Sequence, residues 1–324
     1  MKPHRRQPDK EKSPSNSPEC LPANLEFEGD SQADGLPSRI ARYSRAKERA
    51  LAMRDYLVTI GETKAFEAAG LLQACGNYLH FRHYYTVDQV RLHAAHFCKQ
   101  HLICPLCAIR RGSKTLERYL ERFHVIQAAR PDLKPYLTTF TVLDGPDFWE
   151  RWRHLYACFQ VLKDRRRNFL SGSRSAPWTE FAKVAGAVGS YEFKRGKNSA
   201  LWHPHLHMVT LCASSPNQYA LRSEWEAITG DSFIVDVRPF YEGQPPAQGF
   251  MEVMKYAVKF GSMSLPDNWE VAQFLKGARL LFSLGEFRGV EVPDKLTDEP
   301  LDELPYFDLF YRYISESGYN LVHS

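Results

Sequence analysis

Two histidines separated by one residue carry the clearest chemical signal in this sequence. His205 and His207 lie in the segment WHPHLHMVT at 202–210, which has the alternating pattern of a β-strand. Because side chains two residues apart point to the same face of a strand, both imidazoles could bind one divalent ion. The preceding strand contains Glu192, and antiparallel pairing across the polar turn at 194–199 could bring its carboxylate beside them. Two imidazoles and a carboxylate with open positions are typical of a catalytic ion.

A helix further along the chain carries a possible nucleophile. In the segment MEVMKYAVK at 251–259, Glu252 and Tyr256 are one helical turn apart, and so are Lys255 and Lys259. A tyrosine can attack phosphorus, and a carboxylate one turn away can activate a second nucleophile. Each motif taken alone also fits an ordinary structural role, as a solvent-facing or core histidine pair, a packed tyrosine or solvated lysines.

A cluster of cysteines precedes both motifs. Cys104 and Cys107 form a C-x2-C turn, Cys98 lies shortly before it, and Cys75 lies further upstream beside a glycine. Four thiolates would close a tetrahedral structural Zn²⁺ site and help to position the basic helix that follows. The alternatives are unligated thiols, redox chemistry, or a fourth ligand other than Cys75. The histidines that could replace Cys75 are His93, His96 and His101.

The order of predicted elements indicates how these residues are positioned. Strands are predicted at 136–143, 184–193, 201–211 and 233–237, and helices at 38–74, 108–130, 149–162, 217–229 and 248–260. This order predicts an α+β fold, an antiparallel sheet with helices packed on one face, preceded by a helical and cysteine-rich segment. We expect four regions: a disordered tail at 1–38, the helical zinc segment at 39–130, the sheet core at 131–265 and an acidic extension at 266–324.

Composition and charge narrow the class of protein. The 324 residues include 44% hydrophobic and 25% charged residues with a net charge of +4, values of an ordinary globular protein that exclude collagen, a wholly disordered chain and a disulfide miniprotein. No apolar run approaches the roughly 20 residues of a membrane span, and no signal peptide is apparent. We therefore expect a cytoplasmic protein with no membrane partner.

Basic residues gather in two places that could bind DNA phosphates. Solvated helix faces have the same pattern, and a net charge of +4 does not decide between the two interpretations. Together with Lys255 and Lys259, the residues expected to contact DNA are Arg110, Arg111, Lys114, Arg118, Arg122, Arg165, Arg166 and Arg167.

Taken together and in this order, the motifs at 98–111, 136–142, 203–207 and 252–259 resemble the replication initiator (Rep) proteins of rolling-circle plasmids, in the branch with one catalytic tyrosine. These proteins are HUH endonucleases, named for their histidine–hydrophobic–histidine motif. The resemblance covers roughly 75–259 and implies an HUH nicking core of the RRM-like type. It implies His205 and His207 as ligands of Mg²⁺ or Mn²⁺, Tyr256 as the nucleophile, and Glu252 as the carboxylate used during termination. Glu192 as the third ligand follows from its place in the preceding strand.

The resemblance also implies an activity and partners. The activity would be metal-dependent, sequence-specific nicking of plasmid origin DNA, single-stranded or in an extruded hairpin, through a 5′-phosphotyrosine intermediate, followed by strand transfer and religation. The expected partners are origin DNA and the host helicase and polymerase. The alternatives are another HUH nuclease (a relaxase or a single-tyrosine transposase), a non-catalytic, zinc-stabilised DNA-binding regulator, or a two-histidine metal hydrolase that acts on small molecules.

Overall fold

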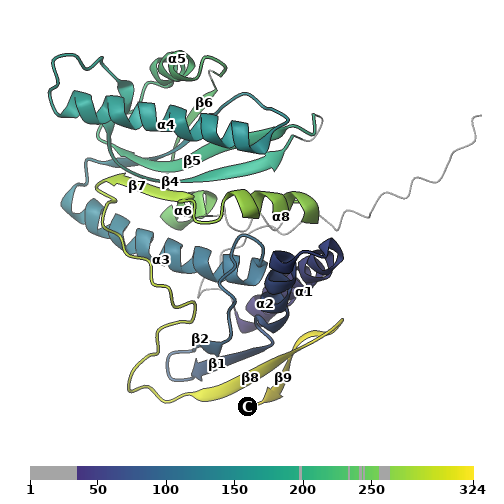
Figure 1. The fold of residues 1–324 in the computed structure, drawn as a ribbon. Coiled ribbons are helices and arrows are strands. Elements are labelled where there is room, and N and C mark those ends of the chain that lie inside the picture. Colours follow the sequence, from purple (N-terminus) through teal and green to yellow (C-terminus); the bar gives the residue numbers. More distant parts are fainter. Residues whose placement is uncertain (1–34, 197–198, 233, 241–242, 244, 255–262) are drawn as a thin grey trace, which may run out of the picture.

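Two antiparallel sheets and the helices packed on them make up this protein (Figure 1), so the α+β class predicted from the sequence is confirmed. The computed structural model describes residues 35–196, 199–232, 234–240, 243, 245–254 and 263–324. The tail expected to be disordered lies almost wholly outside these residues. Among the described residues, no helix combines the length and the apolar character that crossing a membrane requires.

The larger sheet has five strands in the order β6-β3-β5-β4-β7, all antiparallel to their neighbours. The strands are β3 (Lys134–Thr141), β4 (Val184–Arg195), β5 (Trp202–Cys212), β6 (Val235–Pro239) and β7 (Leu281–Gly285). Its central strand is β5, which forms a hairpin with β4. Strand β7, which lies in the acidic extension, pairs with the edge of β4 that faces away from β5.

Helices lie on both faces of this sheet, not on one face as the order of predicted elements had indicated. On one face α4 (Phe148–Leu170) and α5 (Gln218–Thr229) enclose a core that includes Leu206 and Met208. On the other, α3 (Pro105–Ala129) and α6 (Pro246–Met254) pack on a core that includes Val188 and Val209. Because side chains alternate along a strand, His205 and His207 lie on the face shared with α3 and α6.

The smaller sheet has four strands in the order β2-β1-β8-β9. The strands are β1 (Tyr78–Tyr84), β2 (Gln89–Ala95), β8 (Phe307–Ile314) and β9 (Gly318–His323). One face packs against α1 (Leu36–Ile60) and α2 (Thr63–Ala74) and buries Leu79, Phe81 and Tyr319. None of these four strands was predicted from the sequence. The remaining elements are the short helix η1 (Glu180–Lys183) and α8 (Leu265–Phe274).

A buried carboxylate ties the acidic extension to the rest of the molecule. Asp298 is 6% exposed, and its oxygens lie 2.5 Å from Arg110 Nη2 and 3.3 Å from Arg39 Nη2. Lys114 Nζ lies 3.8 Å away, and the backbone N–H of Leu92 donates to Asp298 at 2.6 Å. Burial alone would raise the pKa of Asp298, but the charges of Arg110 and Arg39 outweigh it and lower the pKa to about 2.

We expect Asp298→Asn to lower the free energy of unfolding at pH 7 by about 3 to 5 kcal/mol, because it leaves buried guanidinium groups without their counter-charge. The pKa of Asp298 is lower in the folded state than its ordinary 3.8, so its stabilising contribution is complete above about pH 4 and is lost as the pH falls toward 2. Urea unfolding at pH 7 and pH 3 measures both effects. The exposed Asp302 offers a matched control, and equal losses for Asp298→Asn and Asp302→Asn would contradict this role.

Candidate active site

The β4–β5 hairpin brings Glu192, His205 and His207 together. Glu192 lies directly opposite His205 in the register, as the predicted pairing requires. Its two carboxylate oxygens lie 3.1 Å from His205 Nε2 and 3.4 Å from His207 Nε2. Glu192 and His205 are each 4% exposed, whereas the His207 side chain is 21% exposed. The group is therefore buried on one side and open to solvent at His207.

Both imidazoles are held with Nε2 turned toward the carboxylate. The Nδ1–H of His205 donates to the carbonyl of His203 at 3.3 Å, and His207 Nδ1 lies 2.8 Å from Thr139 Oγ1. Burial lowers the pKa of His205, although Glu192 acts in the opposite direction. A neutral imidazole whose other nitrogen is hydrogen-bonded is the usual form of a metal-ligating histidine.

The donor set fits a divalent ion. One atom from each of the three side chains lies within 4.8 Å of the other two. Ligand bonds of about 2.1 Å place neighbouring donors roughly 3 Å apart, close to the two separations observed here. Glu192, His205 and His207 could therefore hold a metal ion.

Thr139 was not predicted as a site residue, although the strand that contains it was predicted. Its hydroxyl reaches His207 because β3 pairs with β5 so that Thr139 lies opposite His207. Local sequence does not determine which residues of two distant strands are opposite each other. Asp144, in the loop after β3, was also not predicted. Its Oδ1 lies 2.5 Å from His203 Nδ1, because an isolated bridge between Gly145 and the first residue of β5 brings this loop beside that strand.

We expect Thr139→Val to weaken Mn²⁺ binding by about 10- to 100-fold, because it removes the hydroxyl that orients His207 while preserving side-chain shape. Mn²⁺ titration followed by electron paramagnetic resonance measures the change. Thr138→Val is the matched control, since the Thr138 hydroxyl contacts Thr210 and not a histidine. Equal affinity of the Thr139 variant and the wild type would show that the hydroxyl does not orient the ligand.

Helix α6 ends on the same face as the histidines. Ser190, two residues before Glu192 on β4, donates its hydroxyl hydrogen to the carbonyl of Val253 at 2.5 Å. Glu252, in the last described turn of α6, is exposed. Tyr256 and the two lysines at 255 and 259 lie outside the described residues.

The four cysteines gather between α2, β2 and the start of α3. Their sulfurs lie within 4.8 Å of one another, and the separations are 3.6 Å for Cys75 and Cys104, 3.5 Å for Cys75 and Cys107, and 3.6 Å for Cys98 and Cys107. Tetrahedral Zn–S bonds of about 2.3 Å give edges of about 3.8 Å, so the cluster fits zinc. Hydrogen bonds from the other three thiols lower the pKa of Cys75. Cys75, rather than a histidine, is the fourth member of this cluster.

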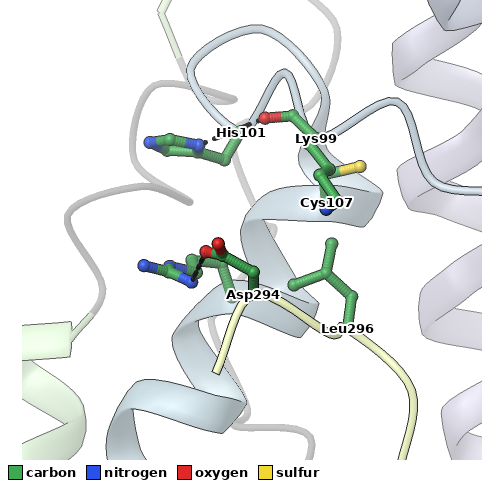
Figure 2. Close-up of a pocket in the computed structure, with 6 residues that line it drawn as sticks. Lys99, His101, Cys107, Asp294 and Leu296 are labelled. Atoms are coloured by element: carbon green, nitrogen blue, oxygen red, sulfur yellow. Dashed lines mark hydrogen bonds and ion pairs between the residues drawn. The ribbon is translucent and has the colours of Figure 1, made fainter. Parts of the chain in front are cut away.

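The surroundings of the cluster agree with that choice. Figure 2 shows a small cavity beside Cys107, with His101 and Asp294 on its wall. The His101 imidazole is turned to the carbonyl of Lys99, 3.3 Å from Nδ1. On the inner side, the 1% exposed Lys47 donates from Nζ to the carbonyl of Cys75 at 2.6 Å. A buried cation at this position offsets the negative charge of the thiolates.

The structure places the predicted DNA-contacting residues in different environments. Arg110 and Lys114 are buried beside Asp298, so these two side chains stabilise the fold. The remaining contacts are Arg111 with Asp294, Arg118 with Glu121, Arg122 with the Glu286 carbonyl, Arg165 with Glu224, Arg166 with the Val184 carbonyl and Arg167 with Asp164. The most exposed are Arg118, with 45% of its side chain accessible, and Arg167, with 70%.

Comparison with known proteins places the chain in a family. A family model described as Replication protein matches residues 89–306, more than half of the chain and a range that includes the histidine motif. A protein from a Bacillus species named "Protein rep" is 24% identical over 262 residues, which cover 71% of this chain and 80% of that protein. No solved structure matches the chain. The chain therefore belongs to the replication protein family and is a plasmid replication initiator.

Proposed function

We propose that this initiator starts rolling-circle replication by nicking one strand of origin DNA, with Tyr256 as the nucleophile. The observation that carries the proposal is the buried Glu192–His205–His207 group on the sheet face where α6 ends, two residues before Tyr256 in the sequence. Mg²⁺ or Mn²⁺ bound there would supply Lewis-acid stabilisation of negative charge on the scissile phosphate.

The bond changes balance without a further reactant. Tyr256 Oη loses its proton to solvent and forms a bond to phosphorus, while the bond from phosphorus to the 3′ oxygen breaks. The departing oxygen takes up a proton and becomes a free 3′-OH, and the 5′ end stays attached as a phosphotyrosine. One ester bond replaces another, so the energy needed for later religation is conserved. The 3′-OH can then prime synthesis by the host polymerase after a host helicase opens the duplex.

Further residues have proposed parts in the same cycle. Glu252, four residues before Tyr256 in the sequence, activates water or a second attack when the regenerated origin is cleaved. Lys255 and Lys259 balance phosphate charge, and the exposed Arg118 and Arg167 contact the DNA backbone. The four-cysteine cluster holds Zn²⁺ in a structural role, since four thiolates leave no open position for substrate.

The first test of this proposal is Tyr256→Phe. Single-stranded origin DNA incubated with the wild type and Mg²⁺ or Mn²⁺ is expected to yield a nicked product and a covalent adduct, visible on a denaturing gel and by intact mass. Phenylalanine has no hydroxyl to attack phosphorus, so no adduct is expected from the variant. Tyr219→Phe, at an exposed position on α5, is the control. If no metal yields cleavage on origin-bearing DNA that the wild type binds, a zinc-stabilised regulator explains the protein better.

A further inference from the structure

The smaller sheet has one face that no described element covers. Figure 1 shows α1 and α2 on one side of this sheet and no described helix on the other. We call this second side the outer face. Its members follow from strand alternation and from the register between neighbours: Tyr78, His80, Arg82, Arg91, His93, Asp308, Phe310, Arg312, Asn320 and His323.

A row of rings crosses all four strands of the outer face. The ring centroids of His93 on β2 and His80 on β1 are 4.9 Å apart, and those of His80 and Phe310 on β8 are 4.1 Å apart with a 20° angle between planes. Phe310 lies 5.9 Å from His323 on β9. His80 is 18% exposed and His93 and Phe310 are half-buried, whereas His323 on β9 and Tyr78 on β1, at the margins of the row, are exposed. Exposed rings on an antiparallel sheet are a common platform for unpaired nucleic-acid bases, because every base has a flat π face.

Guanidinium groups flank this row of rings. Arg82 and Arg91 are opposite each other on β1 and β2, and the exposed Arg312 lies on β8 with its Cζ 5.8 Å from the ring of Tyr78. Asp308 is the one carboxylate among the outer-face residues, and it contacts His80 at 2.6 Å and Arg82 at 3.5 Å. Three cationic groups against one anion give the face a net positive charge, which complements a phosphate backbone.

We propose that the outer face binds single-stranded DNA, with about two or three bases packed against the ring row and the exposed ring of Tyr78, and with phosphates beside the arginines. Stacking needs bases that are not paired, so the rings favour a single strand over a duplex. Replication from the proposed nick would displace one DNA strand, which is the single strand this face would bind. The inference rests on the proposed function in this respect only. The binding itself requires neither Tyr256 nor the metal group.

The test is fluorescence anisotropy with a labelled oligothymidylate of about 20 nucleotides, without divalent ions so that no nicking occurs. Phe310→Ala is expected to weaken binding about 10-fold and Phe310→Tyr to leave it nearly unchanged. Arg312→Ala is expected to weaken binding and to reduce the slope of log affinity against log salt by about 0.7 to 1, a change that a structural defect does not produce. Tyr219→Ala, which removes a 78% exposed ring beside Arg222 on α5, is the matched control.

Three results would overturn the proposal. The first is wild-type affinity for the oligothymidylate in both Phe310→Ala and Arg312→Ala, and the second is equal affinity of the wild type for a duplex of the same length. The third is that these variants lose only self-association of the protein and keep oligothymidylate binding. Thermal unfolding of each variant shows whether it folds, and Arg312→Ala, at an exposed position, keeps the proposal testable if Phe310→Ala does not fold. Failure of this proposal is distinguishable from failure of the proposed nicking function. Glu192→Gln is expected to lose nicking and to keep oligothymidylate binding. Phe310→Ala is expected to lose oligothymidylate binding and to keep nicking of a short origin substrate.

Discussion

Glu192→Gln will reduce origin nicking by at least about 1,000-fold, because it removes the one anionic donor of the proposed metal group while preserving side-chain shape. The loss corresponds to roughly 4 kcal/mol of transition-state stabilisation, within the several kcal/mol that a Lewis-acid ion supplies. The loss of the negative charge also weakens the binding of a divalent ion at this group. Single-turnover nicking and Mn²⁺ titration measure the two consequences.

The control for this substitution is Glu226→Gln, at an exposed position on α5. It makes the same chemical change away from the metal group and is expected to leave nicking and Mn²⁺ affinity unchanged. Both variants should unfold close to the wild-type temperature when the metal is absent. Undiminished nicking by Glu192→Gln would remove this carboxylate from the catalytic group and leave only the histidines.

The second large effect concerns the cysteine cluster. Cys107→Ser will release Zn²⁺ and lower the free energy of unfolding by several kcal/mol, because the binding energy of a structural zinc site is also folding energy. The cluster joins the end of α2, the segment after β2 and the first turn of α3, so its loss frees three parts of the chain at once. Metal content by mass spectrometry and thermal unfolding with and without a chelator measure the result.

Cys158→Ala is the matched control, because Cys158 is also buried, at 6% exposed, but lies on the side of α4 that faces the core of the larger sheet. It should cost the stability of a small core truncation and retain zinc. A chelator should then destabilise the wild type and Cys158→Ala but have little further effect on Cys107→Ser. Full zinc content in Cys107→Ser would show that three thiolates and another ligand suffice.

Local patterns in the sequence were enough for much of this molecule. Alternation with a polar turn predicted the β4–β5 hairpin, and the hairpin by itself brings Glu192 opposite His205. The C-x2-C spacing predicted a cluster that Cys75 completes. The hairpin and the C-x2-C turn involve residues close in the sequence, whose geometry follows from strand and turn chemistry.

The tertiary structure decided the features that depend on distant segments. Strand β8 pairs with β1 across more than two hundred residues, and the outer face exists only because of that pairing. The sequence showed Arg110 and Lys114 as part of a basic helix, but Asp298 arrives from the far end of the chain and buries both. The sequence by itself therefore determined the reactive groups and the hairpin that aligns them. Which charges are buried, and which sheet face stays uncovered, depends on long-range pairing and the desolvation that follows, neither of which a local pattern encodes.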